Sequence, residues 1–364
     1  MALAYNVSQA DSVRYIGDSA SYFMANDFLR ECLSRLIRRD DLTRAEASRL
    51  LDTLLESEST DAQIAAVLVA LAAKGETVDE LAGLASGLRE RAVPIRAAHR
   101  CFIDTAGTGS SGAKTFNIST AAAFVIAAAG LPVAKHGNRA ASSRSGSADV
   151  LSALGVNVSA APPVSEACLN EIGICFMFAP LYHGATARVA SVRRELGVHT
   201  TFNLLGPLSN PAGAPRQIIG VWRDDLAERL ANVLLALGTE RAWVVHGADG
   251  LDEITIAGKT YVAEAHEGTV RTFEIEPADF GLQEGTLDHL RGGDAGANAG
   301  IIREVLAGTR RDEARTLVVI NAAAALVVGG LSNDLSRAAG LAEQSIDSGA
   351  ASTKLDQLVK ATAD

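Results

Sequence analysis

The chain has 364 residues, of which 48% are hydrophobic and 21% are charged, and its formal net charge is −10. This length indicates two domains, or one large domain with a smaller appendage, and the composition provides enough apolar surface for buried cores. The acidic balance argues against a protein whose surface binds nucleic acid or an anionic membrane. The longest apolar stretch, Ala121–Ala134, is interrupted by Gly130 and Pro132 and is too short to span a bilayer.

Residues 1–26 show no steady hydrophobic period and are predicted to form an N-terminal extension. They lack a basic start followed by an apolar segment, so we expect no signal peptide. The chain contains four cysteines and no C-x-x-C pair: Cys32, Cys101, Cys168 and Cys175. We therefore expect reduced, buried thiols in a cytoplasmic protein.

The segment 27–95 is predicted to form a small all-helical domain. Its first apolar residues recur at helical spacing along one face. Gly75 is expected to end a helix as a left-handed cap, and Pro94 to begin the connection to the next domain. Three pairs match the capping-box pattern, namely Thr43 with Glu46, Thr60 with Gln63, and Thr77 with Glu80.

The remaining segment, 96–364, alternates short apolar runs with helical patterns, which predicts an α/β domain with a largely parallel sheet. The expected strands are Cys101–Ile103, Leu131–Ala134, Ile174–Phe178, Gln217–Val221 and Ala242–Val245. The expected helices are Ala121–Ala129, Ala148–Leu154, Asp224–Leu237 and Ala295–Leu306, with a helical tail after Thr316. An antiparallel hairpin is expected from Lys259–Glu264 and Thr269–Ile275.

Most of the chemistry-bearing residues lie between Asp104 and Asp149, in loops that combine glycines, hydroxyl residues and cations. Glycines let the main chain approach a ligand, N–H groups and hydroxyls bind its oxygens, and cations neutralise its charge. This pattern predicts a site for a ligand with several phosphates. Gly107-x-Gly109-x-x-Gly112 also matches the dinucleotide fingerprint, but that motif needs its helix to start among the glycines and an acid at the end of the next strand. Here the helix is expected near Ser119 and the next strand runs into Lys135, which disfavours a nicotinamide dinucleotide.

Several motifs together resemble those of the anthranilate phosphoribosyltransferases. They are Gly107-Thr-Gly, Asn117-Ile-Ser-Thr, Lys135-His-Gly-Asn-Arg, Ser142-Ser-x-Ser-Gly-Ser-Ala-Asp-Val-Leu, Phe202-Asn-Leu-Leu-Gly-Pro-Leu-Ser-Asn-Pro, Val245-His-Gly, Gly250-Leu-Asp-Glu-Ile and Gly292-Gly-Asp-Ala. The match runs in order from about Asp27 to near the C-terminus. It implies a small helical domain, joined by helices from about 180–200, beside a large α/β domain of the nucleoside phosphorylase and phosphoribosyltransferase type. It also implies a homodimer that transfers phosphoribosyl from phosphoribosyl pyrophosphate (PRPP) to the amine of anthranilate in tryptophan biosynthesis.

The resemblance also implies where each substrate binds. Anthranilate would contact Gly107, Asn138 and Arg193, with Arg193 rather than Arg194 pairing with its carboxylate. The residues implied around PRPP are Gly107, Thr108, Gly109, Ser110, Ser111, Thr115, Asn117, Ile118, Ser119, Thr120, Lys135, His136, Gly137, Asn138, Arg139, Ala140, Ala141, Ser142, Ser143 and Ser147.

A magnesium ion is implied at Ser119, Asp252 and Glu253, on the pyrophosphate side. Leaving pyrophosphate accumulates negative charge, which a divalent cation and hydrogen-bond donors stabilise. His136 and His183 are both possible bases. Because the amine of anthranilate is already a neutral nucleophile, neither base is required, and we assign His136 to the wall of the pocket.

The chain departs from the family in two places. Ser110-Ser111 replaces the Gly-Asp of the family's glycine loop, which bears on metal dependence and substrate affinity. The segment after His183 lacks the family's proline, which bears on the acceptor. Two alternatives to the transferase are a pyrimidine nucleoside phosphorylase, disfavoured by the Lys-His-Gly-Asn-Arg and Asp-Glu motifs, and a noncatalytic relative that binds nucleic acid, disfavoured by the acidic charge.

Overall fold

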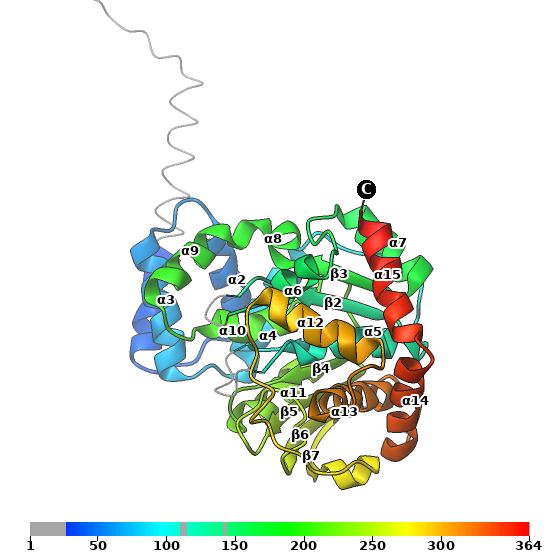
Figure 1. The fold of residues 1–364 in the computed structure, drawn as a ribbon. Coiled ribbons are helices and arrows are strands. Elements are labelled where there is room, and N and C mark those ends of the chain that lie inside the picture. Colours follow the sequence, from blue (N-terminus) through cyan, green and yellow to red (C-terminus); the bar gives the residue numbers. More distant parts are fainter. Residues whose placement is uncertain (1–26, 110–114, 141–143, 364) are drawn as a thin grey trace, which may run out of the picture. The chain divides into compact units, whose positions relative to one another are not determined.

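The computed structural model describes residues 27–109, 115–140 and 144–363 (Figure 1). These residues form two compact units. The first consists of the described residues up to Gly87 together with Ala185–Thr201, and the second consists of Leu88–Gly184 together with the chain from Phe202 onward. The first unit is helical and the second is α/β, which is the predicted combination.

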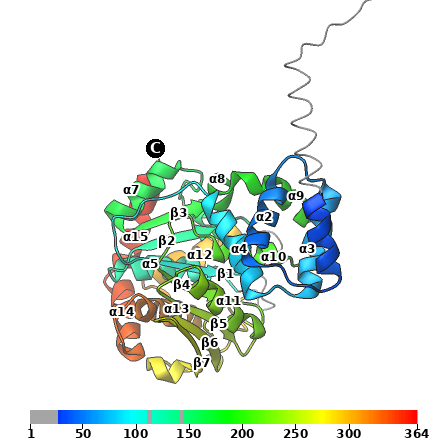
Figure 2. The same cartoon turned by 180° about the vertical axis from the view of Figure 1, so that it is seen from behind.

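The second unit is built around a seven-stranded sheet with the order β3-β2-β1-β4-β5-β6-β7 (Figure 2). The strands are β1 (Ile103–Gly107), β2 (Val133–Gly137), β3 (Ile174–Phe178), β4 (Arg216–Gly220), β5 (Arg241–Gly247), β6 (Thr260–His266) and β7 (Thr269–Ile275). Strands β1 to β5 pair in parallel, whereas β6 and β7 add as an antiparallel hairpin. The structure therefore confirms a largely parallel sheet with an appended hairpin.

Two predicted strands were placed too early. The apolar runs Cys101–Ile103 and Leu131–Ala134 overlap only the first one or two residues of β1 and β2, each of which continues into polar sequence. In β1, Asp104 is fully buried and accepts hydrogen bonds from Asn210 and from the backbone of His136. A polar residue thus belongs to a buried strand because its hydrogen bonds are made inside the protein.

Helices connect and cover the strands. Those of the second unit are α5 (Ile118–Ala128), α6 (Ser147–Ala153), α7 (Pro162–Ile172), α8 (Ala179–Tyr182), α10 (Thr201–Leu208), α11 (Asp225–Ala236), α12 (Ala295–Leu306), α13 (Glu313–Val328), α14 (Leu335–Asp347) and α15 (Ala350–Thr362). Short 3₁₀ turns occur at Gly184–Thr186 and Pro277–Phe280. The predicted helix Ala295–Leu306 is confirmed at both ends, and the other predicted helices are shifted by only a few residues at one or both ends.

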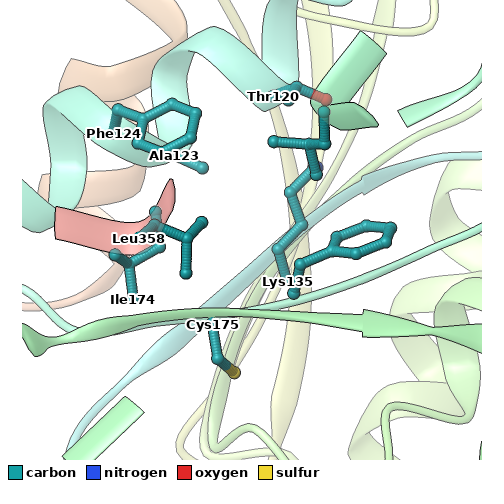
Figure 3. Close-up of a pocket in the computed structure, with 9 residues that line it drawn as sticks. Thr120, Ala123, Phe124, Lys135, Ile174, Cys175 and Leu358 are labelled. Carbon is teal, nitrogen blue, oxygen red and sulfur yellow. The ribbon is translucent and has the colours of Figure 1, made fainter. Parts of the chain in front are cut away.

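The core of the second unit lies where α5 packs against α13, α15 and the strands β1 to β3. Almost every side chain of α5 is buried, because this helix is apolar on all sides. Figure 3 shows a small apolar pocket in this core, where Phe124, Ile174 and Leu358 lie opposite Lys135. The methylene stem of Lys135 is therefore part of the core.

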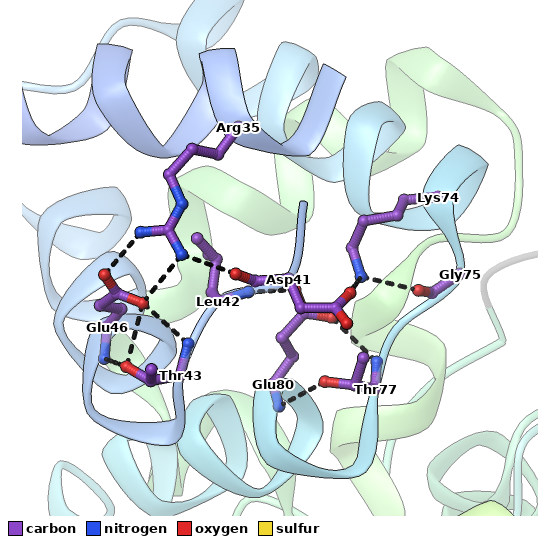
Figure 4. Close-up of polar contacts among 9 residues, drawn as sticks. All are labelled: Arg35, Asp41, Leu42, Thr43, Glu46, Lys74, Gly75, Thr77 and Glu80. Carbon is purple, nitrogen blue, oxygen red and sulfur yellow. Dashed lines mark hydrogen bonds and ion pairs between the residues drawn. The ribbon is translucent and has the colours of Figure 1, made fainter. Parts of the chain in front are cut away.

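The helical unit contains residues 27–37, α2 (Arg44–Leu55), α3 (Asp61–Lys74), most of α4 (Val78–Glu90) and α9 (Ala187–Leu196). All three predicted capping boxes are present, including Thr77 with Glu80 (Figure 4). Gly75 ends α3 with φ +84° and ψ 124°, so it is a cap with positive φ that lies outside the predicted left-handed helical region.

Two further expectations concern membrane segments and thiols. No helix in the described part of the chain is long and apolar enough to cross a membrane. All four cysteines are free thiols. Cys32, Cys168 and Cys175 are buried as expected, whereas Cys101 is only partly buried.

Candidate functional site

Four parallel strands end in glycine at the same edge of the sheet, at Gly107, Gly137, Gly220 and Gly247. A Cβ atom at Gly220 would overlap the carbonyl of Asp252, and one at Gly137 would overlap the hydroxyl of Ser147. The loop after β5 and the first residue of α6 therefore lie directly against these strand ends. In open α/β sheets this carboxyl edge is where ligands bind.

Asp252 and Glu253 follow β5 and reach two of the predicted phosphate-binding segments. The Asp252 carboxylate accepts a hydrogen bond from the backbone N–H of Gly109 at 3.0 Å. The Glu253 carboxylate accepts one from the N–H of Ser119 at 3.2 Å, in the first turn of α5. Burial, together with the nearby Asp252, raises the pKa of Glu253 to about 8. A bound cation would reverse this effect, because it favours both carboxylates in their charged form.

Lys135 lies in the middle of β2, and its side chain is buried. Its Nζ donates to the carbonyl of Thr105 at 2.5 Å and approaches the hydroxyl of Ser119 at 3.4 Å. Burial lowers the pKa of Lys135, and the carboxylates of Asp104 and Glu253 act in the opposite direction. The side-chain nitrogen of Lys135 is thus fixed next to Ser119, in the first turn of α5.

His136 follows Lys135 in β2, so the two side chains lie on opposite faces of the sheet. His136 is also buried. Its Nδ1 lies 3.2 Å from the carbonyl of Gly206, which can only accept, so Nδ1 carries the proton. Within the described part of the chain its buried Nε2 has no hydrogen-bond partner, and its ring packs edge-on against His183 at 5.1 Å between centroids. Burial, followed by the proximity of His183, lowers the pKa of His136 to about 3, so the imidazole is neutral near neutral pH.

The segment after β2 is held by Asp149, a residue for which the sequence predicted no role. One carboxylate oxygen of Asp149 accepts from the backbone N–H groups of Ala140 at 3.0 Å and Gly146 at 2.9 Å. The other accepts from the guanidinium of Arg139 at 2.8 Å. Asp149 thereby fixes the main chain on both sides of residues 141–145.

The motif Gly292-Gly-Asp-Ala lies at the start of α12, and Asn298 of that helix connects it to the site. The Asn298 side chain donates to that of Asn117 at 3.0 Å and accepts from the N–H of Gly293 at 2.8 Å. Asn117 in turn donates to the carbonyl of Ser145 at 3.2 Å. Asn298, which the sequence did not identify, therefore links this motif to the predicted Asn117-Ile-Ser-Thr segment.

The predicted PRPP residues differ in how the structure places them. Direct hydrogen bonds bring Gly109, Ser119 and Lys135 together with Asp252 and Glu253. The side chains of Ile118 and Thr120 are buried in the core, and the Thr108 hydroxyl donates to the carbonyl of Gly220 at 3.1 Å. The predicted residues that lie outside the described part of the chain are Ser110, Ser111, Ala141, Ser142 and Ser143.

The other predicted PRPP residues differ in exposure. Asn138 and Arg139 are exposed at the end of β2, whereas Gly107, Thr115, Asn117, Gly137, Ala140 and Ser147 are partly buried. The two candidate arginines for anthranilate lie in α9 of the helical unit. Arg193 is partly buried, which lowers the pKa of its guanidinium, and Arg194 is exposed.

Comparisons with known proteins agree with this arrangement. Residues 30–92 match the helical bundle domain of a glycosyl transferase family, and residues 99–352 match the a/b domain of a glycosyl transferase family. The chain is 52% identical over 331 residues to the anthranilate phosphoribosyltransferase of Moorella thermoacetica, covering 91% of this chain and 97% of that protein.

Two solved structures are also similar. The anthranilate phosphoribosyltransferase of Thermus thermophilus is 39% identical with a TM-score of 0.86, over 92% of this chain and 99% of the other. The Saccharomyces cerevisiae enzyme in complex with PRPP and Mg is 26% identical with a TM-score of 0.84, over 92% and 98% of the two chains. The chain belongs to the anthranilate phosphoribosyltransferase family.

Proposed function

We propose that this chain transfers the phosphoribosyl group of PRPP to the amine of anthranilate, releasing pyrophosphate, as a step of tryptophan biosynthesis. The observation that carries the proposal is the convergence of the Gly109 loop, the first turn of α5 and Lys135 on the Asp252-Glu253 pair. Backbone N–H groups, a helix N-terminus and a buried lysine suit a ligand with several phosphates. The membership of the chain in the anthranilate phosphoribosyltransferase family is the reason for proposing PRPP as that ligand.

The residues at this edge also fit a magnesium ion. Magnesium is usually held by one or two carboxylates, with water and substrate phosphates completing its octahedral shell. Asp252 and Glu253 offer two carboxylates, and Ser119 offers a hydroxyl on the neighbouring turn. Among the described residues no group of three or more His, Cys, Asp or Glu side chains is placed to hold a metal ion, so the remaining ligands would come from water and PRPP. When bound, the ion would neutralise charge on the departing pyrophosphate.

Anthranilate would be held through its carboxylate by Arg193, with Asn138 and Gly107 as further contacts. A partly buried guanidinium suits a carboxylate, because two parallel hydrogen bonds form in a geometry that also orients the ring. The neutral His136, a weak base because of its lowered pKa, would line the pocket rather than remove a proton. The amine needs no base to attack, since it is neutral at physiological pH.

The activity is tested by mixing the protein with magnesium, PRPP and anthranilate and following the loss of anthranilate fluorescence. We expect a loss that requires all three components and that releases pyrophosphate in equal amount. A matched reaction with a pyrimidine nucleoside and inorganic phosphate should give no free base. If the free pyrimidine base is released and no anthranilate is consumed, the proposal is contradicted and a phosphorylase is favoured.

We also propose that the chain works as a cytoplasmic homodimer with a helical domain of residues 27–95, joined by about 180–200, and an α/β domain of residues 96–364. The free thiols suit a reducing compartment. Three of the six exposed large hydrophobic side chains among the described residues belong to the helical unit: Ile37, Val69 and Val198. The proposal is that these side chains form part of one apolar patch, since a contiguous exposed patch favours association with a second copy.

A further inference from the structure

Asn321 lies in the middle of α13, among alanines, leucines and valines, and its side chain is 5% exposed. Its Oδ1 accepts from the backbone N–H of Ile254 at 2.9 Å, and its Nδ2 donates to the carbonyl of the same residue at 2.9 Å. Nδ2 also donates to the carbonyl of Leu317, one turn earlier, at 2.9 Å. The carboxamide therefore pairs with Ile254 as a neighbouring strand would, through one donor and one acceptor.

Ile254 directly follows Asp252-Glu253, and no strand supplies its hydrogen bonds. Buried backbone groups must be paired, because each unpaired group costs roughly 1–3 kcal/mol. Asn321 binds both the N–H and the carbonyl of Ile254, and these bonds also satisfy the Oδ1 and Nδ2 of its own buried side chain. From the other side, the carbonyl of Asp252 lies against Gly220, where a Cβ atom would overlap it. The two acidic residues are thus held between the end of β4 and the middle of α13.

We infer that Asn321 is a positioning residue that sets the Asp252-Glu253 carboxylates for binding magnesium together with PRPP. The inference rests on the proposed metal role of that pair. A backbone shift at Ile254 would displace the neighbouring Glu253 and loosen its contact with the N–H of Ser119. Residues that orient metal ligands typically change metal affinity by roughly 10- to 100-fold when they are replaced.

The main test replaces the carboxamide by an apolar group of similar size, Asn321→Leu. We expect the affinity for Mn²⁺, measured in the presence of PRPP by the loss of the free-ion electron paramagnetic resonance signal, to fall by roughly 10-fold or more. The magnesium concentration for half-maximal rate should rise by a similar factor, and excess magnesium should restore much of the rate. The KM for anthranilate should change less than about two-fold.

Arg315→Met is the matched control on the same helix. Arg315 is buried and pairs with the partly exposed Asp347 of α14 at 2.9 Å, so this change also removes a polar contact of α13. We expect it to lower the thermal unfolding temperature and to leave Mn²⁺ affinity unchanged. If Arg315→Met loses as much Mn²⁺ affinity as Asn321→Leu, then any damage to α13 weakens metal binding. That result would overturn the specific role of Asn321.

Two further measurements separate the possible failures. If Asp252→Asn with Glu253→Gln binds Mn²⁺ like the wild type, the metal role of the pair fails. If that double variant loses affinity but Asn321→Leu and Asn321→Asp bind normally, only the role of Asn321 fails. Should both Asn321 variants be insoluble, hydrogen exchange of the wild-type protein decides, since the N–H of Ile254 must be strongly protected without ligand. Exchange of that amide at an unprotected rate would overturn the inference.

Discussion

Arg193 and Arg194 are adjacent in α9 and differ in how far solvent reaches them, which makes their comparison informative. Arg193→Ala is expected to raise the apparent KM for anthranilate by roughly ten- to more than a hundred-fold, because a charged hydrogen bond is worth about 1.5–3 kcal/mol. The KM for PRPP should stay within a few-fold. Steady-state kinetics with each substrate varied in turn measures both.

Arg194→Ala is the control for that substitution, since its guanidinium is exposed. We expect both KM values to remain near those of the wild type. If Arg194 proves essential and Arg193 dispensable, the assignment on α9 is shifted by one residue. If neither matters in an active enzyme, the anthranilate carboxylate binds elsewhere.

His136 gives a prediction about stability and pH. The folded protein keeps His136 neutral, with a pKa of about 3, whereas the unfolded chain binds a proton below about pH 6.5. Because the unfolded state takes up the extra proton, stability falls as the pH falls from about 6.5 toward 3. Between about pH 7 and about pH 5 this one residue contributes a loss of about 2 kcal/mol, from 1.4 kcal/mol per pKa unit.

Urea unfolding of the wild type and of His136→Gln at these two pH values measures the effect. The variant starts less stable at neutral pH but should lose about 2 kcal/mol less on acidification, since every other titrating group is common to both proteins. Identical losses would mean that His136 is protonated in the folded state and is not the buried neutral ring described above.

The segment between β2 and α6 depends on one carboxylate. Asp149→Asn leaves the side chain the same size, but replaces an oxygen that accepts two backbone N–H groups, or the oxygen that pairs with Arg139, by an NH₂ donor. We expect the KM for PRPP to rise by roughly ten-fold, since charge-assisted hydrogen bonds are about twice as strong as neutral ones. The KM for anthranilate should change less.

Asp334→Asn is a suitable control, because Asp334 likewise accepts a backbone N–H, that of Arg337, at the start of α14. It should lower the thermal unfolding temperature by a few degrees and leave both KM values unchanged. A similar rise in the KM for PRPP in both variants would mean that Asp149 acts only through general stability.

At the level of helices and strands, local sequence predicted what depends on neighbours in the chain. The capping boxes of α2, α3 and α4 and the bounds of β3 and α12 are examples. Asn298 and Asn321 could not be found in this way. Their partners Asn117 and Ile254 lie 181 and 67 positions away, and an asparagine within a helical pattern does not indicate which distant backbone it meets.

The two-unit organisation of the whole chain could be predicted because each unit has its own periodicity, helical in one and alternating strand and helix in the other. The residue-level site was predicted less completely. Glycines, hydroxyl residues and cations in one stretch of sequence are typical of phosphate sites, and the contacts predicted from them with PRPP stay a prediction. The sequence did not identify Asp104 or Asp149, because a carboxylate that binds backbone N–H groups looks the same in sequence as one in solvent.

The proposed dimer is a property of the whole molecule. Ile37 is 69% exposed and Val198 is 59% exposed, both in the helical unit, and burial of such side chains against a second copy would favour association. We expect the wild type to have the mass of a dimer by size-exclusion chromatography with light scattering. Ile37→Glu or Val198→Glu should shift it toward monomer, because a carboxylate is costly to bury without a partner.

Leu331→Glu, in the α/β unit, is the control and should leave the mass unchanged. All three positions are already exposed, so none of these changes should alter folding of the individual chain, which circular dichroism can verify. A monomeric wild type at micromolar concentration would contradict the dimer. A dimer that persists in both helical-unit variants and dissociates in Leu331→Glu would place the interface on the α/β unit instead.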